Sequence, residues 1–299
     1  MLPIEMQCDF DFEDVNAFIE KCEASNKLNA KTLKAYGFDL KEYSDFSGGI
    51  LNVDSISDYI KYLHEKFTPS TARRKLVSLR LFTNHLLEIG IIEDNPFNKM
   101  NTVVKIPPSY PQSVTSETIQ ELLAAADSNY ENAPTEYQKN AALRNLALLK
   151  LIVSTGLKVS ETSRLNIENV DWKNNIITTT DSAKQKRAFK IDDDVMTTLK
   201  IYYERFKPEI EQNECFFINR FNNRLSEQSI RFMVKKYIAE TNYSGHVTPK
   251  ILRHSIIKML LEDNEVRYVQ GFSGHKSVIS TERYVEFSDE IVYTAIKLK

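Results

Sequence analysis

Long apolar runs and cysteines are scarce in this chain of 299 residues, and each scarcity excludes a class of protein. No apolar run approaches the ~18 residues of a membrane helix, and the richest one, at 146–153, is interrupted by Lys150. The three cysteines, Cys8, Cys22 and Cys215, are odd in number and scattered, which argues against disulfides and against a zinc cluster. The first residues are acidic and lack the basic segment that begins a signal peptide. We therefore expect a cytoplasmic protein.

Motifs for nucleotide and metal chemistry are also missing. The eight glycines are dispersed, and no G-x-x-x-x-G-K-[ST] loop occurs that could hold the phosphates of a nucleotide. Neither H-E-x-x-H nor a pair of C-x-x-C motifs is present. The sequence therefore predicts an activity that needs no nucleotide cofactor and no metal.

An excess of positive charge is absent as well, because the formal net charge is −2. Two segments nevertheless carry four basic residues each and no acid, TARRKLVSLR at 71–80 and SAKQKRAFK at 182–190. An isolated charge run is usually a solvated face. If the protein binds a nucleic acid, its positive charge must be local.

Helical periodicity dominates what is present. Apolar residues recur at helical spacing over 12–25, 31–46, 55–67 and 70–88, with Ser55 as a candidate N-cap. Asn95-Pro96 closes this first group, and the adjacent Pro107 and Pro108 favour an extended linker. We predict a mainly α protein of two domains: an N-terminal helical bundle at 1–100, a linker at 101–113 and a second domain at 114–299.

The second domain resumes with helices and contains one predicted hairpin. A helix over 116–127 has Ser116 as a candidate N-cap, and a buried helix over 142–155 is stopped by Gly156. IITTT at 176–180 and RAFKI at 187–191 are rich in β-branched and aromatic residues, which predicts a small antiparallel sheet. The remainder of the chain is mostly helical.

Four short motifs follow one another along this second domain. TGLKVSE occupies 155–161, TPKILRH occupies 248–254, a Gly-His pair stands at 274–275, and Tyr284 follows His275 by nine residues. Together they resemble the tyrosine site-specific recombinases, the phage-integrase and Xer-like family, whose motifs are TGLR-x-SE, [HK]-x-LRH, LGH and a tyrosine at that spacing. The resemblance covers nearly the whole chain. It implies a SAM-like, DNA-binding bundle at 10–98 and a catalytic domain at 114–299.

The resemblance also implies an activity and a set of roles. Members of this family cut DNA by attack of a tyrosine hydroxyl on a phosphodiester, which gives a 3′-phosphotyrosyl intermediate that is rejoined to a new 5′-hydroxyl. By the resemblance, the catalytic residues are Tyr284, Arg253, Lys158, Lys250, His275 and Lys184. Glu161 and His254 are expected to support these residues.

The lysine of the hairpin is the least defined of these residues. Counted back from Arg187, the position of the family's catalytic lysine falls near Ser182. Lys184 can therefore take that role only if the alignment shifts by about two residues. Lys186 is the reserve, and a solvated hairpin tip remains the alternative for Lys184.

Lys158 is the departure from the family pattern, because it stands where the first catalytic arginine is expected. Lysine keeps the positive charge but lacks the planar fork that binds two phosphate oxygens. Two explanations are open: a naturally degenerate lineage that is slow or serves as a DNA-binding accessory, or a deliberate Arg→Lys change that stalls the reaction. The intact remainder of the motif set favours the second.

Double-stranded DNA is the expected partner. We expect the two domains to close around the duplex, with contacts to backbone phosphates from the basic side chains Arg73, Arg74, Arg80, Lys186 and Arg187. The segment 288–299 has apolar residues at helical spacing, and by resemblance it docks on a neighbouring protomer in a synaptic tetramer; the alternative is a helix packed on its own domain. The rival functions are a monomeric type IB topoisomerase and a non-catalytic DNA-binding regulator.

Overall fold

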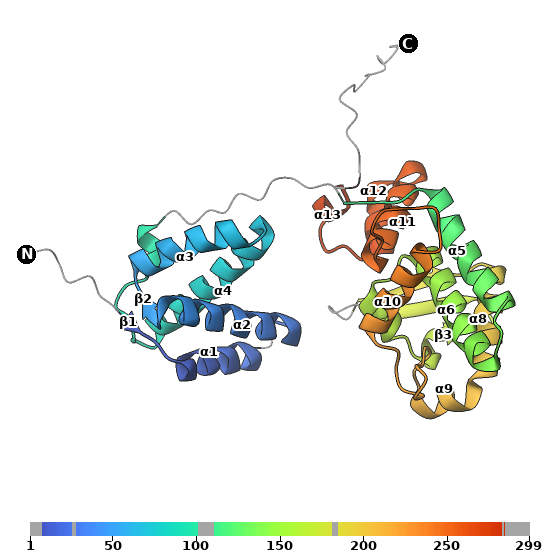
Figure 1. Cartoon of the computed structure of the whole chain (residues 1–299), viewed down its shortest axis with the longest axis horizontal. Helices are drawn as coiled ribbons and strands as arrows, with labels where there is room; N and C mark the ends of the chain where they lie inside the picture. Colours follow the sequence, from blue (N-terminus) through green and yellow to red (C-terminus); the bar gives the residue numbers. More distant parts are fainter. Residues whose placement is uncertain (1–7, 26–27, 101–110, 181–184, 283, 285–299) are drawn as a thin grey trace, which may run out of the picture. The chain divides into compact units, whose positions relative to one another are not determined.

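The computed structural model describes the whole chain except residues 1–7, 26–27, 101–110, 181–184, 283 and 285–299 (Figure 1). It divides into two compact units, 1–108 and 109–299, and each unit has its own hydrophobic core. Most of the predicted linker lies outside the described residues, and so does the helix expected in 288–299. No helix of the described part is both long enough and apolar enough to cross a membrane.

The first unit is a helical bundle with one short antiparallel pair of strands. Its elements are β1 (Cys8–Asp9), α1 (Phe12–Ala24), α2 (Ala30–Ser47), β2 (Ile50–Leu51), α3 (Val53–Lys66), α4 (Pro69–Glu88) and the 3-10 helix η1 (Pro96–Lys99). Aromatic rings fill its core, where Tyr43 and Tyr59 meet edge to face at 4.9 Å between ring centroids and Phe82 packs against Phe10 at 5.1 Å. Burial of such large rings contributes most of the driving force for folding a small unit.

The second unit is mostly helical and holds a sheet of three antiparallel strands in the order β3-β4-β5. Its elements are α5 (Ser116–Glu131), α6 (Glu136–Thr155), α7 (Val159–Ser163), η2 (Ile167–Asn169), β3 (Val170–Asp171), β4 (Ile176–Thr180), β5 (Lys186–Lys190), α8 (Asp193–Arg205), α9 (Lys207–Asn213), α10 (Glu227–Ile238), α11 (Pro249–Asp263), α12 (Val266–Ser273) and α13 (Ile279–Glu282). The prediction of a mainly α protein with a small antiparallel sheet is therefore confirmed.

The hairpin forms one residue earlier than predicted on its second strand. Thr180 pairs with Lys186 and Ile176 with Lys190, so β5 begins at Lys186. Phe189 and Ile177 face each other in this register, and both are buried. The two-residue strand β3 was not predicted, because a segment that short carries no alternation of its own.

Both predicted N-caps are wrong by one to three residues. Asn52 caps α3 and accepts a hydrogen bond from the Ser55 N–H at 2.8 Å, while the Ser55 hydroxyl accepts from the Asn52 N–H at 3.0 Å. This reciprocal arrangement is a capping box, in which Ser55 is the third helical residue. Thr115 caps α5, and Ser116 is its first residue. Runs of polar residues that can each cap a helix do not fix the boundary to one position.

Candidate active site

A cavity of about 520 Å³ in the second unit gathers most of the predicted catalytic side chains. It is lined by Pro111, Lys158, Val159, Pro249, Lys250, Arg253, His254, His275, Ser280 and Tyr284. These residues come from five parts of the chain: the segment before α5, the turn between α6 and α7, the start of α11, the loop after α12, and α13 with the turn that follows it. Of the six predicted catalytic residues, five line this cavity; Lys184 lies outside the described residues.

The turn between α6 and α7 presents Lys158 to the cavity. Gly156 ends α6 in the left-handed conformation with φ 57°, which glycine adopts without a steric penalty. Lys158 then becomes the N-cap of α7, and its N–H donates to Oε2 of Glu161 at 2.9 Å. The Lys158 ammonium lies 3.7 Å from Oε1 of Glu161; the Lys158 side chain is 41% exposed, whereas that of Glu161 is buried. Glu161 therefore fixes the turn through the Lys158 backbone N–H and leaves the Lys158 ammonium accessible.

Arg253 is the most constrained of the cavity residues. Its side chain is buried, and its two terminal nitrogens donate to the carbonyl oxygens of Gly156 and Ser273. A guanidinium has five N–H groups, so these two bonds orient the fork without using all its donors. Burial lowers the pKa of Arg253 below its ordinary value, although the nearby carboxylate of Glu161 opposes this shift. The helix α11 is thereby joined to the ends of both α6 and α12.

Arg187, which was predicted to contact DNA, is bound by groups of the protein itself. Its side chain is only 10% exposed, and its guanidinium forms an ion pair with Oε1 of Glu161 at 2.7 Å and donates to the Phe272 carbonyl at 2.6 Å. Gly274 lies directly against it, since a Cβ added at Gly274 would approach Nε of Arg187 to 2.9 Å. Arg187 thus connects the hairpin, the α7 turn and the Gly-His loop, and its charge is used inside the protein. Sequence reasoning missed this because a basic run gives no sign of which member is buried.

Tyr284 lies beside two imidazole rings. His275 stacks on it with 6.0 Å between ring centroids, and His254 meets it edge to face at 5.2 Å. Nδ1 of His275 contacts the hydroxyl of the buried Thr281 at 2.9 Å, and the Tyr284 N–H donates to the Thr281 carbonyl at 3.1 Å. Thr281 was not predicted as part of the site, although its position three residues before Tyr284 in a helical turn could have suggested its contact with Tyr284.

Both histidines are neutral near pH 7. Burial, together with the positive charges of Arg253 and Lys158, lowers the pKa of His275 to about 4. Burial and the charge of Lys250 also lower the pKa of His254. Nδ1 of His254 lies 3.3 Å from the Gln112 carbonyl, which can only accept, so this nitrogen carries the proton and Nε2 carries the lone pair.

The remaining basic residues of the prediction do not line this cavity. Lys186 is exposed at the start of β5. In the first unit, Arg73 and Arg80 are exposed on α4, and the Arg80 guanidinium lies 5.1 Å from the ring centroid of Phe97. Arg74 instead forms an ion pair with the buried Asp39, so its charge is compensated within the bundle.

Among the described residues, no group of three histidine, cysteine or carboxylate side chains could hold a metal ion.

The order of these residues along the chain matches a known family. Residues 112–290 match the model of the phage integrase family. The chain belongs to this family. A tyrosine recombinase of Agathobacter rectalis is 33% identical to it over 283 residues, a match that covers 90% of each protein. The chain is thus a tyrosine site-specific recombinase by family.

Solved structures show the same fold at low sequence identity. XerH site-specific recombinase bound to a palindromic difH substrate, in a post-cleavage complex, matches with a TM-score of 0.70 and 15% identity, covering 90% of this chain and 80% of that one. A lambda integrase tetramer bound to a Holliday junction matches with a TM-score of 0.70 and 16% identity, covering 97% and 81%. At such identities the likeness establishes the two-domain integrase fold.

Proposed function

We propose that Tyr284 is the nucleophile with which this recombinase cuts and rejoins DNA strands at a specific site. The observation that carries the proposal is the convergence of Tyr284, Arg253, Lys158, Lys250 and His275 on one cavity. A phosphodiester in this cavity would meet a hydroxyl nucleophile and three cationic side chains. That combination suits transfer of a phosphoryl group through a negatively charged transition state.

The reaction exchanges one phosphoester bond for another. The hydroxyl oxygen of Tyr284 attacks phosphorus, a phosphotyrosyl bond forms, and the bond from phosphorus to the 5′-oxygen breaks. The tyrosine loses one proton and the departing 5′-oxygen gains one, so attack by another 5′-hydroxyl reverses the step. No nucleotide hydrolysis is required, because the energy of the phosphodiester is kept in the phosphotyrosyl bond.

Removal of the tyrosine proton requires help, since a phenol with a pKa of ~10 is ionised in only about one molecule in a thousand at neutral pH. Nε2 of the neutral His254 is an available acceptor beside the tyrosine ring. His275 has its Nδ1 engaged with Thr281, so Nε2 is the nitrogen that can hydrogen-bond a phosphate oxygen. We assign proton acceptance to His254 and phosphate binding to His275. Protonation of the 5′-oxygen is assigned to Lys184, with Lys186 as the reserve.

Charge stabilisation falls to Arg253, Lys158 and Lys250. The Arg253 fork is already oriented by two carbonyl bonds and can bind two phosphate oxygens without further ordering. Lys158 attracts the phosphate as a point charge but cannot fix its orientation. Loss of one oriented donor of this kind costs about 10²–10³ in rate. We therefore expect slow cleavage, restored by Lys158→Arg.

DNA and further copies of the chain are the proposed partners. The structural relatives are bound to difH DNA in one case and form a tetramer on a Holliday junction in the other, which supports duplex DNA and tetrameric synapsis here. The exposed Arg73, Arg80 and Lys186 remain candidates for phosphate contacts. The docking of 288–299 on a neighbouring protomer stays a prediction.

A nicked suicide substrate tests the proposal, because release of a short strand traps the covalent intermediate. The cognate site is first recovered by selecting DNA fragments that the protein binds. Covalent adduct is then compared for the chain with Lys158, Lys158→Arg and Tyr284→Phe. We expect adduct to rise about 10²-fold with the arginine and to vanish with the phenylalanine. Equal rates for the lysine and arginine forms would contradict the role assigned to position 158.

Lys158 also favours one alternative, a silenced DNA-binding protein of the same fold. Such a protein would bind the selected fragments tightly and give no adduct from any of the three chains. Rescue by arginine would exclude it, since rescue requires that the remainder of the site still functions.

A further inference from the structure

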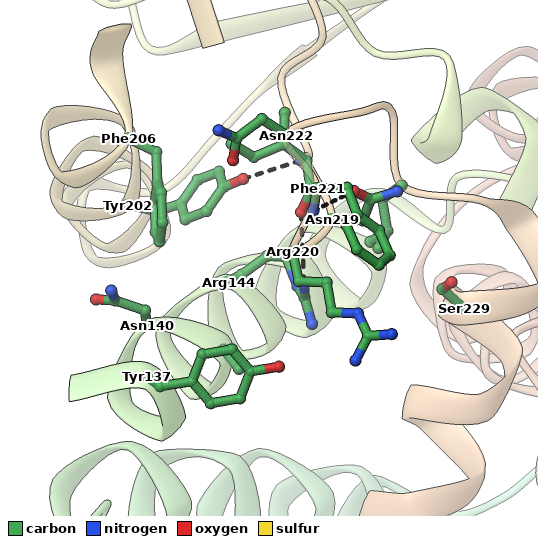
Figure 2. Close-up of a pocket in the computed structure, with 13 residues that line it drawn as sticks. Tyr137, Asn140, Arg144, Tyr202, Phe206, Asn219, Arg220, Phe221, Asn222 and Ser229 are labelled. Atoms are coloured by element: carbon green, nitrogen blue, oxygen red, sulfur yellow. Dashed lines mark hydrogen bonds between the residues drawn. The ribbon is translucent and has the colours of Figure 1, made fainter. Parts of the chain in front are cut away.

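A second pocket of about 430 Å³ lies in the catalytic unit, away from the cavity around Tyr284. Its walls come from α6, the end of α8, the loop between α9 and α10, and the start of α10 (Figure 2). On α6 it includes Arg144, twelve residues before Gly156 and thus about 18 Å along the helix from the candidate active site. The two sites share no lining residue.

Two arginines give this pocket its charge. Figure 2 shows the side chains of Arg144, Arg220 and Tyr137 turned toward the same space. Among the described residues, none that lines the pocket carries a carboxylate. The surface of this pocket is therefore positive and offers no internal counter-ion.

Arg144 is held by neutral acceptors. Its Nε and one terminal nitrogen donate to Oδ1 of Asn145 at 3.2 and 2.9 Å, and the other terminal nitrogen donates to the Ile218 carbonyl at 3.4 Å. Burial lowers the pKa of Arg144 below its ordinary value. A desolvated guanidinium that is not paired with an anion is costly, and an incoming carboxylate would offset that cost.

The rim of the pocket is aromatic and firmly built. Tyr137 and Phe221 are 65% and 67% exposed, and the Arg220 guanidinium lies 4.6 Å from the centroid of the Phe221 ring. The loop beneath them is a tight turn in which Oδ1 of Asn219 accepts from the N–H groups of Phe221 and Asn223. Exposed aromatic rings next to arginine are the residue types that dominate protein interfaces.

We propose that this pocket, hereafter the Arg144 pocket, binds an acidic segment of another protein. An aspartate or glutamate of the segment pairs with Arg144 at the base, and an adjacent apolar side chain packs between Tyr137 and Phe221. A peptide is favoured over duplex DNA because the phosphates of a duplex lie on a stiff convex surface, whereas a flexible segment can insert a side chain into a hollow. The proposal does not depend on the recombination chemistry.

Peptide display on the full chain tests whether the Arg144 pocket binds an acidic segment. A library of random twelve-residue peptides is selected on the native protein and counter-selected on the double rim variant Arg220→Ala, Phe221→Ser. We expect the enriched peptides to share an acidic residue beside an apolar one. A synthetic peptide of that sequence should bind Arg144→Gln at least about tenfold more weakly, and its own acid-to-amide counterpart should be weakened equally on the native chain.

Three controls make the result decisive. Arg267→Ala removes an exposed arginine of the same unit that does not line the pocket, and it should leave the affinity unchanged. Equal melting temperatures show whether Arg144→Gln folds; if it does not, the exposed Arg220→Ala decides instead. Inorganic phosphate and a single-stranded twelve-nucleotide DNA are titrated in parallel. No enrichment, enrichment without acids, or a DNA affinity that depends on Arg144 while peptides fail would each overturn the proposal.

Discussion

Thr281 joins two residues that the sequence motif keeps nine positions apart. Its hydroxyl contacts Nδ1 of His275 at 2.9 Å, and its carbonyl accepts from the Tyr284 N–H at 3.1 Å. Because the side chain is fully buried, water cannot replace the hydroxyl. Thr281 is thus a positioning residue that fixes the imidazole ring relative to the tyrosine backbone.

Thr281→Val should slow cleavage because it removes the hydroxyl at nearly constant volume. A buried hydrogen bond contributes about 0.5–1.5 kcal/mol, so we expect a loss of about twofold to tenfold. Single-turnover cleavage of the suicide substrate measures it, on the Lys158→Arg background if the native rate is too low. Thr281→Ser keeps the hydroxyl and should retain most of the rate. A serine form as slow as the valine form would show that packing, not the hydrogen bond, matters here.

The low pKa of His275 makes stability depend on pH. The imidazole titrates near pH 4 in the folded protein and near 6.5 when unfolded. Between these values the unfolded chain binds more protons, so the free energy of unfolding falls as the pH drops through this window. His275→Gln cannot titrate, so from pH 7 to pH 5 it should lose less stability than the native protein. Urea unfolding of DNA-free protein checks this, and parallel losses in both forms would contradict it.

At the scale of elements, the loop after α12 is shaped by a glycine pressed against Arg187. Gly274 has φ 65°, and an added Cβ would lie 2.9 Å from Nε of Arg187. Gly156 has φ 57°, but an added Cβ there would meet the side chains of Ile256 and Phe272 at ordinary contact distances of 3.5 and 3.7 Å. Both alanine variants incur the left-handed backbone penalty, so their difference isolates the contact with the arginine.

Gly274→Ala should therefore destabilise the protein by about 1–3 kcal/mol more than Gly156→Ala, the usual cost of forcing extra atoms into a packed site. The free energy of unfolding of both variants, measured by urea titration, gives the comparison. Equal losses would mean that Arg187 moves aside freely and does not hold the loop.

How far the elements could be predicted depends on how local their causes are. The helix that ends at Gly156 and the hairpin on β-branched residues follow from short-range patterns, and both are present. The capping residues were misassigned because several neighbouring polar side chains satisfy the same rule. Arg187 and Arg74 form ion pairs with Glu161 and Asp39, which are distant in the sequence. Local sequence patterns could not predict these ion pairs. The five cavity residues were found because their order, not their surroundings, carries the information.

At the scale of the whole molecule, a net charge of −2 means that any attraction to DNA is local. Lys186 is exposed on β5 and, unlike Arg187, is not buried in an ion pair. Lys186→Ala should weaken DNA binding at every sequence and reduce the slope of log affinity against log salt by about one. Lys139→Ala, on the far end of α6, should leave that slope unchanged. Identical slopes for both variants and the native chain would remove Lys186 from the DNA surface.

Phosphotyrosyl chemistry in the cavity around Tyr284 can be tested by identifying the residue that becomes bonded to DNA. Adduct trapped on the suicide substrate with the Lys158→Arg chain is digested with nuclease and protease and analysed by mass spectrometry. We expect one modified residue, Tyr284, carrying the phosphate of the DNA 3′ end. Attachment to any other residue, or the absence of a covalent adduct on a site that the protein binds tightly, would contradict it.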